Sequence, residues 1–66
     1  MKYVVVQRTG FMPYFLCTWS FEGDDEWSPL AMRALRFEGK RARAIAARLN
    51  ARNPGSPLPV RVETLG

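Results

Sequence analysis

The sequence predicts an α+β fold: a small antiparallel three-stranded sheet with one main helix packed on one face, in the order β-β-(short α)-α-β. Three observations predict it: two strand-type runs near the N-terminus, a helical apolar stripe in the middle, and an alternating Val run near the C-terminus. A chain of 66 residues buries only about 60% of the surface that it exposes when unfolded. We therefore expect a single domain over residues 1–66.

Two strands are expected first. The run from Tyr3 to Arg8 contains three consecutive Val residues, which favour extended backbone. Pro13 cannot donate to a ladder, so the second strand is expected from Tyr14 to Phe21, joined to the first as an antiparallel hairpin. Strict alternation divides this second strand into two faces, one with Phe15, Cys17, Trp19 and Phe21, the other with Tyr14, Leu16, Thr18 and Ser20.

A polar loop and a short helix are expected next. Residues 22–26 hold four of the six acidic residues and read as a loop. Ser28-Pro29 is a helix-start signal, since Ser caps free N–H groups and Pro fits the first helical position. Trp27 and Met32 have the spacing of a hydrophobic staple. We expect a helix of about two turns from Pro29 to about Arg36.

The main helix is expected from Lys40 to Ala51. Its apolar residues repeat at i, i+3, i+4 and i+7 and form a narrow stripe: Ala42, Ile45, Ala46 and Leu49. Gly39, a poor helix former, separates this helix from the preceding segment. Residues 53–57, which contain Asn, Pro, Gly and Ser, end it. A last strand is expected after Pro59, where Val60 and Val62 alternate with charged residues.

The Ala-rich stripe lets the helix approach the sheet closely, so the large core side chains must come from the sheet. The expected suppliers are Phe15, Trp19, Val4 or Val5, Val60 and Val62, with Phe37 closing one end.

Composition excludes several classes of chemistry. The chain has no His, which removes His-based acid/base catalysis, Ser-His and Cys-His nucleophiles and most zinc sites. The acidic loop lacks the D-x-[DN]-x-[DN]-G pattern, so we interpret it as solvated or as facing the basic helix rather than as a calcium site. We expect no enzyme, no cofactor and no metal.

The single Cys17 indicates a reducing compartment, because secreted chains of this size usually carry several disulfides. Its position between Leu16 and Thr18 favours a buried core thiol over a reactive one. The chain has no apolar run of membrane-spanning length and no signal-peptide pattern. We expect a cytoplasmic protein without a membrane partner.

Core-type residues also follow one spacing, W-x6-A-x2-F-x4-A-x3-A-x2-L, formed by Trp27, Ala34, Phe37, Ala42, Ala46 and Leu49. With the hairpin before it and the Val-rich strand after it, this pattern resembles the short ββαβ proteins common in phages and prophages. The resemblance covers nearly the whole chain and implies that Trp and Phe brace a sheet on which the Ala/Leu stripe docks the helix. It transfers no catalytic or ligand residue. Such proteins often bind and disable host machinery, and some anti-CRISPR proteins are similarly small.

Two departures from that group stand out. Gly39 occupies the place where a Ser, Thr or Asp cap is more usual, and the helix is basic where many such inhibitors are acidic. A basic helix does not suit mimicry of nucleic acid.

The basic helix is the first candidate site. The net charge is +4, but residues 33–52 alone hold seven basic residues and one acidic residue, a local charge of +6. At 100° per residue, Arg41, Arg48 and Arg52 lie within about 40° of each other beside the apolar stripe, and Arg33 and Arg36 precede them. These side chains could clamp phosphates or an acidic protein groove. Alternatively, they could form a solvated face of the helix, in which the aliphatic stems of the Arg side chains cover a small Ala-rich core.

An apolar patch on the hairpin is the second candidate. One helix can cover only one face of the sheet, so Tyr14 and Leu16, with Phe11 and Met12 at the hairpin tip, are expected to remain exposed. An uncovered apolar patch indicates a partner site. The alternative is that the segment from Trp27 to Phe37 folds over that face and forms a second small core.

These features predict a non-enzymatic, phage-type binding protein that inhibits or occludes a host protein or ribonucleoprotein complex, with a CRISPR effector as one candidate. The alternative is a nucleic-acid-binding module that contacts phosphates through the 40–52 helix. A homodimer through an open sheet edge or through the uncovered face of the sheet is compatible with either function.

Overall fold

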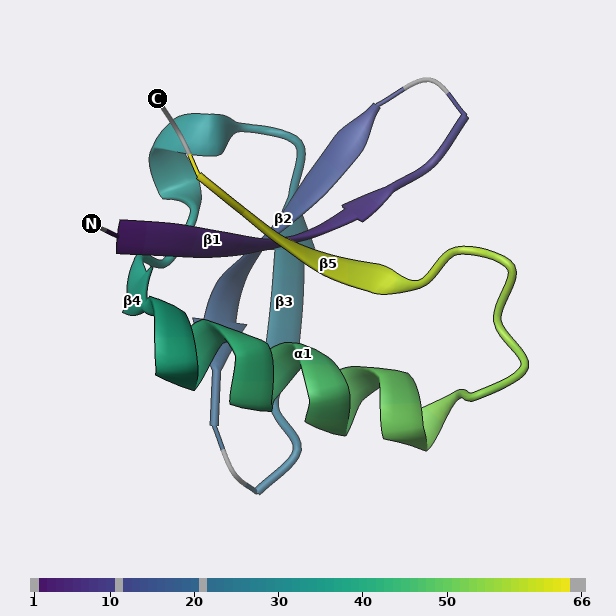
Figure 1. Ribbon diagram of the computed structural model, residues 1–66. Coiled ribbons are helices and arrows are strands. Elements are labelled where there is room, and N and C mark those ends of the chain that lie inside the picture. The colour runs from purple at the N-terminus through teal and green to yellow at the C-terminus, as the bar shows by residue number, and fades with distance from the viewer. Residues whose placement is uncertain (1, 11, 21, 65–66) are drawn as a thin grey trace.

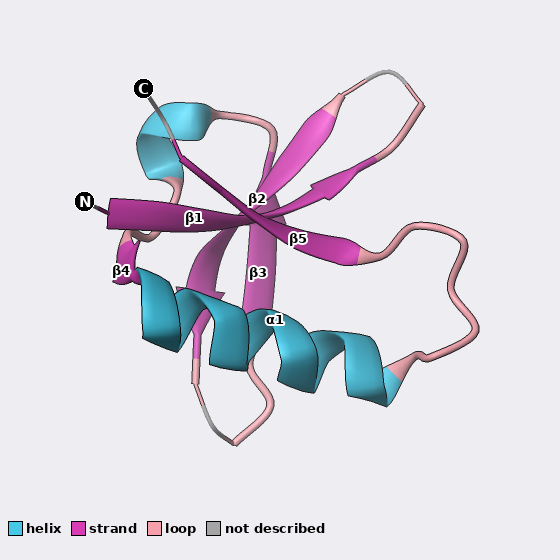
Figure 2. Cartoon of the chain, viewed as in Figure 1, coloured by secondary structure: helices cyan, strands magenta, loops and turns pink. Residues whose placement is uncertain are grey.

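The computed structural model describes residues 2–10, 12–20 and 22–64 (Figures 1 and 2). In chain order the elements are β1 (Lys2–Arg8), β2 (Pro13–Trp19), β3 (Asp25–Ser28), a 3-10 helix η1 (Ala31–Arg33), β4 (Phe37–Glu38), α1 (Gly39–Arg52) and β5 (Val60–Thr64). The predicted α+β class is confirmed. The prediction of a three-stranded sheet is wrong, because the described residues form a five-stranded antiparallel sheet.

Strand β1 is the centre of the sheet. On one side it pairs with β5 along Tyr3 to Gln7, and on the other side with β2 near its C-terminal end and with β4 near its N-terminal end. Strand β3 then pairs with the outer side of β2. All pairings are antiparallel, and the curled sheet carries α1 across one side (Figure 1).

A β-bulge interrupts β2 at Cys17. Leu16 is paired with Trp27 and Thr18 with the adjacent Glu26, so two steps along β2 match one step along β3. The extra residue reverses the alternation of side chains beyond it. Leu16 and Trp19 therefore lie on the same side of the sheet, and the two faces predicted from strict alternation are wrong for this strand.

The side of the sheet that faces α1 holds the larger core. The predicted helix stripe is confirmed, since Ala42, Ile45, Ala46 and Leu49 are all buried. They form one cluster with Val5, Leu16 and Phe37, and the partly buried Trp19, Trp27, Val60 and Val62 pack against it. Leu16 has no exposed surface, so the prediction that it belongs to an open patch is wrong. Phe15, predicted to face the helix, lies on the opposite side of the sheet.

A second, smaller core covers that opposite side. Val4, Val6 and Phe15 are buried together, and Ala34 packs against them. The segment that follows β3 brings Ala34 to this side. The next residue, Leu35, packs against the main cluster, and its amide donates to the Leu16 carbonyl at 3.0 Å. The second core expected as an alternative therefore exists, although it covers Phe15 rather than Tyr14 and Leu16.

The predicted two-turn helix from Pro29 to about Arg36 is wrong. The only helical residues there are Ala31–Arg33, and Met32, expected to staple against Trp27, is 86% exposed. Ser28 lies in β3 opposite Phe15, and its Oγ accepts only the nearby Leu30 amide, at 3.2 Å. The few residues between Ser28 and Leu35 must cross the sheet, which requires mostly extended backbone.

Strand β3 is not predicted from the sequence: Asp25 and Glu26 are expected in the acidic loop, and Trp27 and Ser28 at the start of a helix. Acidic residues also have a low preference for strands. Two interactions offset that preference. Trp27 pairs with Leu16 across the ladder, and its indole Nε1 donates to Asp25 Oδ2 at 2.9 Å. Cys17, expected in the core, is only half buried at the bulge.

Helix α1 begins at Gly39, one residue before the predicted start. A Cβ at Gly39 would lie 3.0 Å from Cε2 of Tyr3, which is tighter than ordinary van der Waals contact. The Tyr3 ring thus packs directly on the helix start, and this close approach accounts for Gly at a position where a capping residue is usual.

Asn50 occupies part of the outer edge of β5. The Val60 amide donates to Asn50 Oδ1 at 2.8 Å, and Asn50 Nδ2 donates to the Val60 carbonyl at 3.0 Å. Because outward and inward backbone groups alternate along an antiparallel strand, Val60, Val62 and Thr64 direct their polar groups to this edge. Asn50 therefore takes the place of a neighbouring strand at Val60 and shortens the edge that another chain could join.

Within the described residues, no helix has both the length and the apolar character needed to cross a bilayer.

The burial of Leu16 predicts unequal losses of stability for two truncations, one in β2 and one in the turn before it. Leu16→Ala should lower the free energy of unfolding by about 2–5 kcal/mol, because it empties a fully buried site. Met12→Ala, at a residue that is 44% exposed, should change it by less than about 0.5 kcal/mol. Urea unfolding followed by Trp fluorescence measures both. Similar small losses for the two variants would contradict the burial of Leu16 in the main core.

The edge role of Asn50 predicts a change in association as well as in stability. Asn50→Ala leaves the Val60 amide and carbonyl without their partner, and we expect a loss of about 1–3 kcal/mol together with concentration-dependent self-association. Asn50→Asp keeps the acceptor and loses only the donor, so its effect should be intermediate. Sedimentation velocity over a concentration series measures the association. A strictly monomeric Asn50→Ala of normal stability would refute this role.

Candidate functional site

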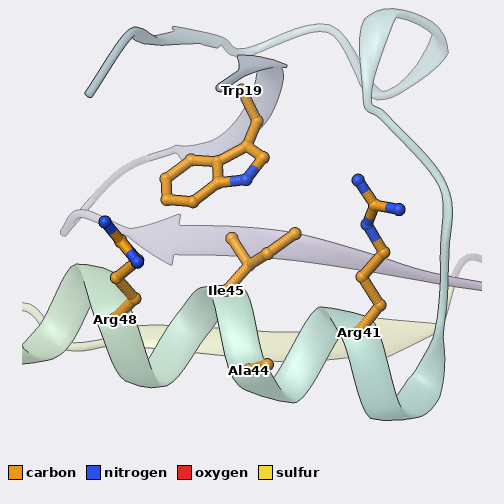
Figure 3. Close-up of a pocket in the computed structure, with 5 residues that line it drawn as sticks. All are labelled: Trp19, Arg41, Ala44, Ile45 and Arg48. Carbon is orange, nitrogen blue, oxygen red and sulfur yellow. The ribbon is translucent and has the colours of Figure 1, made fainter. Parts of the chain in front are cut away.

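A shallow pocket lies between α1 and the end of β2 (Figure 3). Its volume is about 220 Å³, and it is lined by Trp19, Arg41, Ala44, Ile45 and Arg48. Figure 3 shows the Trp19 indole above Ile45, with the Arg41 and Arg48 side chains rising from the helix on either side of it. The floor is apolar and the two ends are cationic.

The bulge in β2 creates this pocket. It turns Trp19 toward the helix side of the sheet, where the indole packs against the main core cluster. Arg41 and Arg48 are seven residues apart, so they project in nearly the same direction two helical turns from each other. Arg41 also stacks over the buried Phe37 ring, with its Cζ 5.8 Å from the ring centroid. This contact fixes one end of the pocket.

Arg52, the third residue of the predicted stripe, has a structural role. Its Nη1 lies 3.3 Å from Asp25 Oδ1, and its Nη2 donates to the Gly23 carbonyl at 3.2 Å. Gly23 has a φ of 109°, a conformation that favours glycine. The end of α1 is thereby tied to the turn before β3. The expectation that the acidic loop faces the basic helix is confirmed for Asp25.

The other predicted basic residues do not join this pocket. Arg33 ends η1 and Arg36 precedes β4, both exposed on the connection that crosses the opposite side of the sheet. On α1, Arg43 lies about 150° around the helix from Arg41 and Arg48. Its Nη1 reaches back to within 3.2 Å of where a Gly39 Cβ would lie. The basic side chains are spread over several faces of the molecule.

Two of the four residues predicted for the hairpin patch, Met12 and Tyr14, are described and at least partly exposed. Met12 is exposed and Tyr14 is half buried, whereas Leu16 belongs to the core. Phe11 lies outside the described residues. The structure does not bring the hairpin residues together with Arg41 and Arg48 in the pocket.

Three of the described carboxylates, Asp25, Glu38 and Glu63, form ion pairs with cations. Lys2 Nζ lies 2.7 Å from Glu38 Oε1, and Arg8 Nη2 lies 2.6 Å from Glu63 Oε1. A side-chain hydrogen bond from the cationic partner lowers the pKa of Glu38 and that of Glu63 below the ordinary value. Among the described residues, no three His, Cys, Asp or Glu side chains gather as metal ligands would.

The sequence predicts the two Arg residues of the pocket but not the apolar side chains that line it between them. Trp19 was expected in the core and Ala44 was not considered at all. The signal for Trp19 is the bulge, which depends on the pairing of β2 with β3. Because the sequence predicts a loop and then a helix start where β3 lies, it gives no indication of this pairing.

No family model matches the chain, and neither the curated proteins nor the solved structures contain a significant match to it.

The Arg8–Glu63 pair predicts a pH dependence of stability. The lowered pKa of Glu63 contributes stability above its unfolded pKa of about 4.3, and this contribution is lost as the pH falls through the lower folded pKa. Arg8→Gln should therefore be less stable than the parent at neutral pH and approach it in acid. The urea midpoint measured at a series of pH values tests this.

Arg61→Gln is the matched control, because Arg61 acts on Glu63 only through its charge. Its midpoint should follow the parent curve closely. A constant difference between Arg8→Gln and the parent from neutral to acid pH would contradict the linkage.

Proposed function

We propose that this chain is a non-enzymatic binding protein that docks on an acidic surface of a host macromolecular machine and occludes it. This is the mode of action implied by its resemblance to short phage proteins, and a CRISPR effector is the first machine to test. The partner would be a protein or a ribonucleoprotein complex.

One observation carries this proposal. Arg41 and Arg48 flank an apolar pocket on the exposed side of a rigid helix, which combines charge recognition with a place to bury an apolar group. Binding surfaces draw most of their affinity from such central apolar anchors with Arg beside them. A solvated basic face needs no pocket and no Trp between its cations.

The contact surface we propose differs from the one expected from the sequence alone. Leu16 leaves it because it is buried, and Arg52 because Asp25 and Gly23 hold its guanidinium. Arg41, Arg48 and Trp19 form its centre. Met12 and Tyr14, on the hairpin, and Arg33 and Arg36, on the crossing segment, are at most peripheral.

Direct binding of nucleic acid is the second candidate, favoured by the number of exposed cations on α1: Lys40, Arg41, Arg43, Arg48 and Arg52. A module that neutralises three to five phosphates should show a log–log salt slope of roughly −3 to −5. The distribution of these cations around the helix argues against one continuous phosphate track, which is why this function ranks second.

Two double variants with the same change in charge distinguish these functions. Arg41→Glu with Arg48→Glu reverses the cations of the pocket, and Lys40→Glu with Arg43→Glu reverses two cations elsewhere on the same helix. Each tagged protein is incubated with lysates of candidate bacterial hosts, with and without nuclease. We expect a stoichiometric protein complex that survives nuclease, persists with the Lys40/Arg43 variant and is lost with the Arg41/Arg48 variant.

Equal loss of the complex with both variants, or capture of nucleic acid with no protein partner, would contradict the proposed function and favour nucleic acid. Circular dichroism of each variant serves as the folding control, because all four positions are exposed and should tolerate the change.

A further inference from the structure

We propose that the outer edge of β5 binds an extended segment of another protein, which adds to the sheet as a further antiparallel strand. The segment would pair with Val62 and Thr64. It would carry a large apolar residue opposite Val62, followed by an acidic residue opposite Arg61. This inference goes beyond the proposed function, and none of the residues that line the pocket takes part in it.

The outer edge of β5 presents backbone groups that no strand bonds. Within the described residues, β5 pairs with β1 alone (Figure 1). The Val60 amide donates to Asn50 Oδ1, and the Val60 carbonyl accepts from Asn50 Nδ2. Val60 therefore faces away from β1, and by alternation so do Val62 and Thr64. Amides and carbonyls that repeat at every second residue match an extended polypeptide rather than a nucleic acid or a lipid.

Asn50 determines where the available edge ends. Its side chain already bonds both backbone groups of Val60, so an added strand can bond at Val62 and Thr64 but not farther toward the start of β5. Only two residues of β5 are then left to exchange backbone hydrogen bonds with the added strand. We therefore expect weak binding in fast exchange, as befits an auxiliary contact.

A second copy of this chain fits the edge poorly. If Val62 lies opposite Val62 of the second copy, Thr64 lies opposite Val60, whose groups Asn50 holds. This is the register that Asn50→Ala would open. A register with Val62 opposite Thr64 avoids Val60 but places Glu63 opposite Glu63 of the second copy, and like charges directly opposite each other destabilise a pairing. The edge is therefore suited to a different chain.

The side chains beside the edge specify the added segment. Val62 lies opposite Val5 and packs against the main core cluster, so an apolar residue opposite Val62 would extend that cluster on the α1 side of the sheet. Arg61, on the other side, is exposed and has no ion pair among the residues that the structure describes. A carboxylate opposite Arg61 would supply one. Glu63 already pairs with Arg8, so a neutral residue suffices opposite it.

The test is a titration of the isotope-labelled protein with the acetylated peptide amide Ser-Val-Thr-Ile-Glu-Gly. In antiparallel pairing its Ile lies opposite Val62 and its Glu opposite Arg61. Amide hydrogen exchange is measured residue by residue. We expect the peptide to slow exchange of the Val62 and Thr64 amides, which face away from β1. The Arg61 and Glu63 amides face β1, so they should change little and serve as internal controls.

Two N-methylated peptides test whether the backbone carries the interaction. N-methylation of the Ile removes the donor to the Val62 carbonyl and should weaken binding by about tenfold or more. N-methylation of the preceding Thr is the matched control. The amide of that Thr faces away from β5, so its methylation should leave binding nearly unchanged.

Variants of the protein test the charge and the location of the site. Arg61→Glu should weaken binding of the peptide by about threefold or more, and exchanging the Glu of the peptide for Lys should restore it. Circular dichroism is the folding control, because Arg61 is exposed and should tolerate the change. The variant with Arg41→Glu and Arg48→Glu should bind the peptide as the parent does, which separates this edge from the pocket.

Three results would overturn the inference. The first is unchanged exchange of the Val62 and Thr64 amides at millimolar peptide, and the second is equal binding of the two N-methylated peptides. The third is protection of the same amides when the concentration of the parent protein alone is raised, which would assign the edge to a second copy of the chain.

Discussion

The extra residue that Cys17 adds to β2 determines which side chains reach helix α1. Without the bulge, Leu16 and Trp19 would point to opposite sides of the sheet, as alternation requires. With it, both face the helix, so Leu16 fills the main core and Trp19 forms the wall of the pocket. The core and the candidate binding site thus share one local irregularity, as is common for bulges close to functional sites.

Other parts of the structure follow from this arrangement. Phe15, on the other side of the strand, needs its own cover, and the segment containing η1 supplies it through Ala34. Helix α1 is anchored at its C-terminal end. Arg52 ties the end of the helix to the turn before β3, and Asn50 ties it to β5. The pocket therefore stands on a rigid frame rather than on a loop, which favours precise recognition.

Regular periodicity was sufficient to predict the regular elements. The stripe of Ala42, Ile45, Ala46 and Leu49 predicted the buried face of α1, and the Val run predicted β1, because both follow the ideal repeat. The bulge, β3 and the short η1 were missed, since each depends on contacts with residues distant in the sequence. Trp27 could be assigned to a strand only by knowing its partner Leu16, and Ser28-Pro29 resembles a helix start even though Ser28 belongs to the ladder. For the same reason the sequence identified Arg41 and Arg48 but not the indole between them.

The most direct test of this account is to record nuclear Overhauser contacts of the Trp19 ring and the Leu16 methyl groups. If the bulge turns both residues toward α1, the ring protons of Trp19 and the methyl protons of Leu16 should both show contacts to Ile45, and the Trp19 ring should show none to the Phe15 ring. Contacts from Trp19 to Val4, Val6 or Ala34 in place of Ile45 would show that β2 alternates regularly, and the pocket and the binding surface built on it would not exist.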